Sequence, residues 1–144
     1  TEADWENYKD DLDTKYSHRV FSGRTNEEMQ PRFFNNPIQT TDELRWMPRA
    51  PFQYYMIGFR DFIQAEVFGP LWAASAASCF LGLVIEKLER HPNHIVPIMP
   101  DLLPTIEYVA NNQEKFEAEK SIFGDFREKF NRIRELYAAV GGQK

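Results

Sequence analysis

The chain is poor in cysteine: among its 144 residues only Cys79 is present, in the middle of an apolar stretch. One cysteine makes no disulfide within the chain, so nothing indicates an oxidising compartment. The first residues, TEADWENYKDD, are polar and acidic and lack the apolar core of a secretory signal peptide. We therefore expect a cytoplasmic protein.

Motifs that carry chemistry are also missing. His91 and His94 are the only closely spaced histidines, and no second cluster completes the four ligands of a structural zinc site. The chain has no glycine-rich phosphate loop, no G-x-S-x-G turn and no basic patch with interleaved aromatics. Its net charge of −5 disfavours binding to nucleic-acid phosphates. We therefore expect a protein that is not an enzyme, has no cofactor or metal, and binds no nucleic acid.

What is present is a long uncharged run, Val67–Ile85, with the sequence VFGPLWAASAASCFLGLVI. A membrane-spanning helix needs ~20 predominantly apolar residues. Here Gly69-Pro70 shortens the usable helix, and alanine and serine dominate its middle. We therefore predict a buried central helix over Pro70–Arg90. A membrane-associated subunit that uses residues 67–85 is the alternative.

Helical periodicity elsewhere in the chain predicts amphipathic helices around this central one. The small residues of the central helix allow a close approach on two sides, which we assign to the helices Pro51–Glu66 and Lys120–Val140. The fold class that follows is all-α: one domain, residues 1–144, with a bundle of four to five helices around a buried central helix. The other expected segments are a helix over Thr1–Tyr16, irregular chain over 17–40, an extended linker over 91–100 and a helix that Asp101 caps.

Local signals add three expectations. Thr40 and Glu43 have the capping-box spacing, so a helical turn is predicted to start at Thr40. Gly141-Gly142 is a natural stop for the last helix. Lys87 lies among charged residues at the end of the central helix, which predicts that this end is exposed to solvent.

Charge and hot-spot residues indicate where a partner would bind. Residues 1–30 carry eight acidic and four basic side chains, so an acidic face there could attract a basic partner. Residues 44–49, LRWMPR, combine tryptophan and arginine with stiffening prolines, a composition enriched at binding hot spots. The alternatives are a solvated acidic helix face and a Trp46 that simply packs at the entrance of the next helix. The candidate partner-binding residues are Asp10, Asp11, Asp13, Arg45, Trp46 and Arg49.

The segment LRWMPRAPFQYYMIGFRDFI resembles small helical bacterial proteins of the toxin-immunity type, over about twenty of the 144 residues. The residues that carry the resemblance are Trp46, Met47, Pro48, Pro51, Phe52, Tyr54, Tyr55 and Phe59. It implies a bacterial origin and a toxin-neutralising role, and it transfers no catalytic residue.

The function expected from these observations is a non-enzymatic protein that sequesters a protein partner, as an immunity protein blocks a basic toxin domain. The alternative is a helical domain that binds or converts a small molecule. Such a domain would use an aromatic-lined pocket between helices, formed by Tyr54, Tyr55 and His91.

Overall fold

The computed structural model describes residues 1–140, and every regular element in this range is a helix or a helical turn. The all-α prediction is confirmed, with more and shorter helices than the four to five expected. The α-helices are α1 (Leu12–Phe21), α2 (Asn26–Asn35), α3 (Pro37–Arg45), α4 (Arg49–Ala65), α5 (Ala73–Arg90), α6 (Pro92–Ile95), α7 (Met99–Asn111), α8 (Lys120–Phe123) and α9 (Phe126–Val140). The 3-10 turns are η1 (Glu2–Trp5), η2 (Tyr8–Asp10), η3 (Val96–Ile98) and η4 (Gln113–Phe116).

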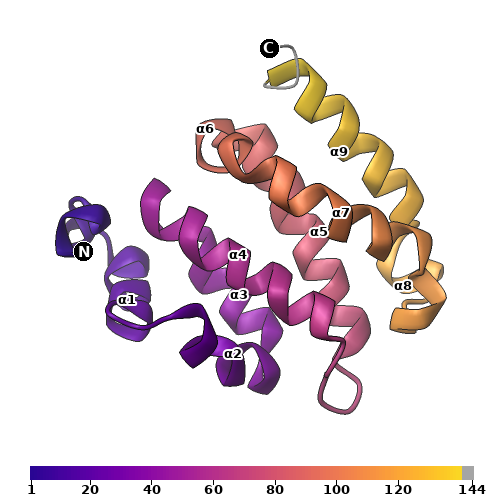
Figure 1. Ribbon diagram of the computed structural model, residues 1–144, viewed down its shortest axis with the longest axis horizontal. Coiled ribbons are helices and arrows are strands. Elements are labelled where there is room, and N and C mark those ends of the chain that lie inside the picture. The colour runs from indigo at the N-terminus through magenta and orange to yellow at the C-terminus, as the bar shows by residue number, and fades with distance from the viewer. Residues whose placement is uncertain (141–144) are drawn as a thin grey trace.

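The helix α5 is the element around which the others pack. It contacts α3, α4, α6 and α9, and it runs through the middle of the molecule (Figure 1). Its side chains Phe80, Leu81 and Val84 are fully buried. The predicted central helix and its packing against the neighbouring helices α4 and α9 are therefore confirmed, and α3 is a further neighbour.

Two details of α5 differ from the prediction. The helix begins at Ala73 rather than Pro70, since Leu71 has a left-handed backbone with φ of 69°. Gly82 is exposed, and a Cβ added there would meet no atom within 4 Å. The close approach of neighbouring helices therefore depends on the buried alanines rather than on Gly82. Among residues 1–140, the structure contains no helix that is both long enough and apolar enough to cross a membrane.

The N-terminal segment is not the single helix predicted over Thr1–Tyr16. The turns η1 and η2 come first, and Glu6 between them has a φ of 53°, which breaks a regular helix. The helix α1 then starts after Asp11, whose side chain accepts a hydrogen bond from the Thr14 backbone N–H at 3.1 Å. Glu6 and Asp11 therefore separate η1, η2 and α1, so the residues before and after Glu6 lie on different elements.

Residues 17–40, predicted to be irregular, are largely helical. A capping box between Thr25 and Glu28 starts α2, which tolerates Pro31 in its interior. Pro37 then occupies the first turn of α3, and Asn36 caps that helix through a hydrogen bond to Gln39. Thr40 is consequently an interior residue of α3 and not a cap. Pro31 thus lies inside a continuous helix and Pro37 begins one, so neither proline forms a loop.

The predicted proline linker over residues 91–100 is also wrong. Pro92 starts α6, Pro97 lies in η3 and Pro100 lies in the first turn of α7, so each proline occupies an early helical position. The helix α7 begins at Met99, two residues before Asp101.

The last predicted helix is interrupted. Gly124, with φ of 78°, separates α8 from α9, and the buried Gln113 side chain donates a hydrogen bond to its carbonyl at 2.8 Å. The predicted stop at Gly141-Gly142 lies outside the described residues.

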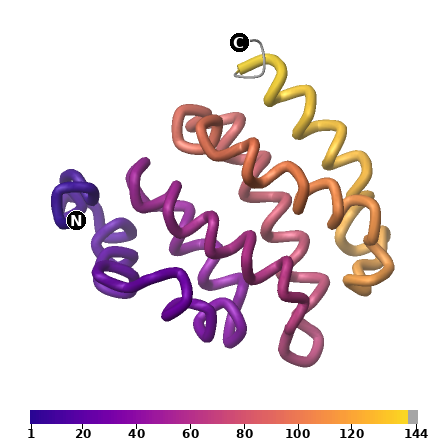
Figure 2. Tube along the Cα trace, in the orientation of Figure 1, coloured from indigo at the N-terminus to yellow at the C-terminus, as the bar shows by residue number. Residues whose placement is uncertain are grey.

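The N-terminal turns and α9 lie at opposite ends of the molecule (Figure 2). Asp10, Asp11 and Asp13, which lie in η2 and at the start of α1, are therefore at the end of the molecule away from α9.

Candidate functional site

The predicted partner-binding residues from two parts of the chain meet on one surface. The Thr14 hydroxyl in α1 lies 2.9 Å from the Trp46 carbonyl oxygen and shares its one hydrogen between this oxygen and the Asp11 carboxylate. One turn later the buried Ser17 hydroxyl donates to the Glu43 carbonyl oxygen at 2.7 Å. These two bonds fix the first turns of α1 against the connection between α3 and α4. The acidic segment and the tryptophan segment are therefore neighbours in space, although more than thirty residues separate them in sequence.

The three aspartates of this surface differ in role. Asp11 is the N-cap of α1, and its carboxylate accepts hydrogen bonds from the Thr14 hydroxyl at 2.6 Å and backbone N–H at 3.1 Å. The hydrogen bond from the Thr14 hydroxyl lowers the pKa of Asp11 most, and the hydrogen bond from the Thr14 backbone N–H lowers it further. Asp10 and Asp13 are exposed, so their charges face solvent. A binding role fits Asp10 and Asp13 better than Asp11, whose charge already stabilises the start of a helix.

The residues of the tryptophan segment also divide. Arg45 is held by its ion pairs with Asp42 and with Glu86, whose two carboxylate oxygens each accept from Nε at 3.0 Å. Trp46 is 43% exposed, and Arg49 is exposed at the start of α4. Arg45 therefore organises the junction of α3 with α5, whereas Trp46 and Arg49 remain accessible to a partner.

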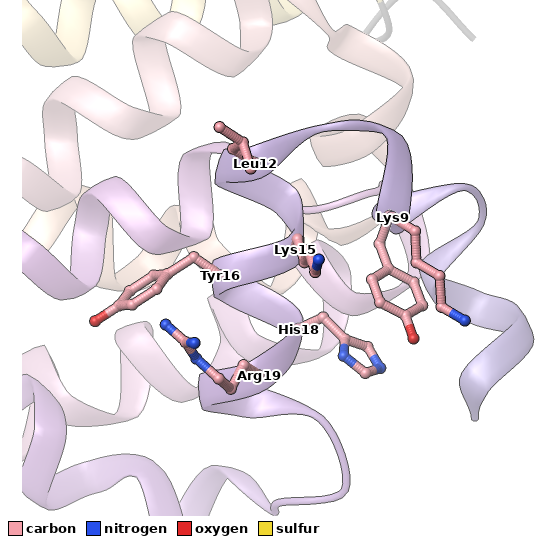
Figure 3. A pocket seen from close by; sticks show the side chains of 7 residues that line it. Lys9, Leu12, Lys15, Tyr16, His18 and Arg19 are labelled. Carbon is pink, nitrogen blue, oxygen red and sulfur yellow. The ribbon is translucent and has the colours of Figure 1, made fainter.

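A groove runs along α1 and is shown in Figure 3. Its volume is about 550 Å³. Leu12 is 83% exposed at its edge. Tyr16 and Arg19 lie together on one side of α1, with the guanidinium 5.0 Å from the ring centroid, and His18 lies on the other side. The residues that line this α1 groove are Tyr8, Lys9, Leu12, Lys15, Tyr16, His18 and Arg19. Exposed apolar groups and basic ends therefore lie side by side, beside the acidic N-terminus of the same helix.

A second hollow adjoins the first, and Tyr8 lines both. It lies where the N-terminal turns, the connection between α3 and α4, and the junction of α5 with α6 meet. We call it the Lys87 cleft. Its volume is about 310 Å³, and its lining residues are Trp5, Glu6, Asn7, Tyr8, Thr14, Arg45, Trp46, Met47, Pro48, Lys87, His91 and His94. Two of the predicted residues, Arg45 and Trp46, therefore take part in a cleft that sequence reasoning did not anticipate.

Lys87 is buried in the wall of this cleft, with a relative exposure of 1%, whereas the sequence predicted an exposed helix end. Its ammonium donates a hydrogen bond to the Arg45 carbonyl oxygen at 2.9 Å and lies 4.8 Å from the centroid of the Phe52 ring. Burial lowers the pKa of Lys87 to about 8, opposed by the attraction of Glu86 and assisted by the charge of Arg45. The amine is therefore far easier to deprotonate than an exposed lysine.

His94 shares this environment. Burial, together with the positive charges of Lys87, His91 and Arg49, lowers the pKa of His94 to about 4. Its ring lies 5.0 Å from that of His91, and its buried Nδ1 has no hydrogen-bond partner. The ring is therefore neutral at pH 7. Over residues 1–140, no group of three or more histidine, cysteine, aspartate or glutamate side chains lies close enough to hold a metal ion.

Tyr54, Tyr55 and His91, predicted to form one pocket, do not together line either of these two hollows. His91 lines the Lys87 cleft, but neither tyrosine does. The Tyr55 hydroxyl instead lies within hydrogen-bond distance of the carbonyl oxygens of Phe21 at 2.6 Å and Arg24 at 2.7 Å, so its one hydrogen ties α4 to the end of α1. Tyr55 is thus a structural residue.

Sequence reasoning missed Lys87 and His94 as site residues, although the spacing of the two histidines was a usable signal for one of them. No sequence signal marked Lys87, because Glu86, Glu89 and Arg90 around it are charged and indicate an exposed helix end. No family model, curated protein sequence or solved structure matches this chain.

Proposed function

We propose that the chain sequesters a protein partner on the surface formed by the N-terminal turns, α1 and the connection between α3 and α4. The observation that carries the proposal is the exposure of large apolar side chains beside two hollows. Leu12 is 83% exposed on the α1 groove and Trp46 is 43% exposed on the Lys87 cleft. Apolar groups that gather around hollows and are bordered by charge favour a protein interface.

The charges at the rim favour a basic partner surface. Asp10 and Asp13 are exposed near the N-terminus of α1, where their field is not cancelled by an ion pair among residues 1–140. Complementary charges at such a rim accelerate association more than they raise affinity. The narrower form of the proposal is a bacterial, cytoplasmic immunity protein that occludes the basic active-site surface of a cognate toxin. The acidic first segment and the resemblance over residues 44–63 support it.

Co-expression with the product of the adjacent gene tests the proposal directly. The two proteins should co-purify, and the chain should restore growth to cells that carry the partner. Leu12→Ala and Trp46→Ala should weaken the complex, whereas Ile122→Ala should not, since Ile122 is similarly exposed, at 69%, but lies on α8. Absence of both a complex and growth rescue, or an equal effect of Ile122→Ala, would contradict the proposal.

The electrostatic part has a separate test. Charge reversal by Asp10→Lys with Asp13→Lys should slow association and reduce its dependence on salt. Asp11→Asn is the matched variant, because asparagine keeps the helix cap while removing the charge. Association rates that do not change in the double variant would remove the aspartates from the interface.

A further inference from the structure

The Lys87 cleft contains a buried cation without a counter-ion. Lys87 makes no ion pair among the described residues. The adjacent Glu86 carboxylate is engaged by Arg45 through both of its oxygens at 3.0 Å. Buried charges in folded proteins are normally paired, because moving a charge out of water costs free energy unless a partner of opposite charge compensates for it. An unpaired ammonium at the wall of a cleft therefore calls for an anion from outside the chain.

The rest of the cleft defines the shape of such an anion. Trp5, Tyr8 and Trp46 contribute aromatic surface to its lining. The volume of about 310 Å³ is at the small end of the range for small-molecule sites. The charge of Arg49 also acts on this region, as its effect on His94 shows. The carboxylate of Glu6 is at the exposed rim and limits how far a negative ligand can extend.

We propose that the Lys87 cleft binds a small organic anion, a carboxylate or phosphate group on a flat apolar body. An ammonium has three N–H donors, and the Arg45 carbonyl oxygen accepts one of them. The other two can donate to the oxygens of the anion, while the aromatic residues contact its body. This site goes beyond the protein-binding proposal and does not rest on it.

Calorimetric titration at pH 7 with four probes tests the site: benzoate, phenyl phosphate, inorganic phosphate and the neutral benzamide. Benzoate or phenyl phosphate should bind saturably, and which of them binds more tightly separates a carboxylate from a phosphate ligand. Benzamide should bind at least about tenfold more weakly, because a charged hydrogen bond is lost. Inorganic phosphate should also bind more weakly, since it has no apolar body.

Two variants locate the site. Lys87→Met should reduce the affinity for the preferred anion at least about tenfold. Lys129→Met is the matched control, because Lys129 is also partly buried over an aromatic ring, at 5.5 Å from Phe126, and lies outside the cleft. Circular dichroism checks that both variants are folded. If Lys87→Met does not fold, the comparison of benzoate with benzamide on the unmodified protein tests the anion site without it.

Three results would overturn the inference: no saturable binding of either aryl anion at millimolar concentration, equal binding of benzamide, or equal affinity in Lys87→Met. None of these results touches the protein complex, whose tests use other residues and another readout.

Discussion

Replacing Lys87 with methionine should stabilise the protein at pH 7, because it removes a buried charge without leaving a cavity. The pKa of Lys87 is lowered from 10.5 to about 8. At about 1.4 kcal/mol for each pH unit, the charged amine makes folding less favourable by about 3 kcal/mol at pH 7. Methionine has a similar length and no charge, and it forfeits a hydrogen bond worth about 1 kcal/mol. The expected net gain is therefore about 2 kcal/mol, or roughly 6 °C in the melting temperature.

The pH dependence makes this prediction specific. The folded protein releases the Lys87 proton above pH 8, whereas the unfolded chain keeps it up to about pH 10.5. The stability of the unmodified protein should therefore rise over this range. The advantage of the variant should vanish near pH ~9.5 and reverse to about 1 kcal/mol of destabilisation above pH ~10.5. Other titratable groups facing Lys87, namely Glu86, Arg45, His91 and His94, are present in both proteins and cancel to first order in the difference.

Urea unfolding followed by far-UV circular dichroism, at unit steps from pH 7 to 10, measures the difference in free energy of unfolding. A difference that stays constant with pH would refute the burial of a charged Lys87. A variant that is less stable than the unmodified protein at pH 7 would show that the hydrogen bond to Arg45 and the contact with Phe52 outweigh the charge.

Three further predictions test the packing and electrostatics of the fold. Gly58→Ala should destabilise the protein by about 1–3 kcal/mol, because the new Cβ would overlap the side chain of Asn26, whereas Gly82→Ala has open space and should stabilise it by about 0.5–1 kcal/mol. Equal midpoints in urea would contradict the packing of α2 on α4. Glu43→Ala should cost about 2 kcal/mol in the same assay, because the buried Glu43 carboxylate forms an ion pair with the guanidinium of Arg32, which is 35% exposed and loses its partner. A loss below ~1 kcal/mol would mean that water replaces the carboxylate. His94→Gln should gain stability relative to the unmodified protein as the pH falls from about 6.5 to 4. The pKa of His94 is about 4 in the folded protein and higher in the unfolded chain, so acid favours unfolding of the unmodified protein. Melting temperatures of the two proteins that fall in parallel would show that His94 is protonated in the folded protein.

The central helix and its neighbour α4 could be predicted because their signals are local. An uncharged run ending in charged residues indicated α5, and apolar residues at helical spacing indicated α4 to within two residues at its start and one at its end. Prolines were misleading by contrast. Pro37 and Pro92 were read as loop residues, yet each lies in the first turn of a helix, where its missing N–H is not needed. These two prolines therefore marked a helix boundary correctly, but they did not show on which side of the boundary the helix lies.

The candidate site was predicted in part. Trp46 and Asp13 are exposed on neighbouring elements, as residues of a binding surface must be. Leu12 follows Trp5 and Tyr8 at spacings of three and four residues, which is typical of one apolar stripe on a continuous helix. It is 83% exposed because the positive φ at Glu6 ends that stripe before α1 begins. No glycine or proline near Glu6 indicates this break in the sequence.

The sequence by itself determined the all-α class, the identity of the central helix and the absence of recognisable catalytic motifs, since composition and periodicity act over a few neighbouring residues. Only the tertiary structure decided which charges are buried. Lys87 follows Glu86 directly and precedes Glu89 by two residues in the sequence. It is enclosed because the C-terminal end of α3, about forty residues earlier, supplies the Arg45 carbonyl oxygen to which its ammonium donates. Burial depends on what long-range packing brings over a side chain, and no local pattern encodes it.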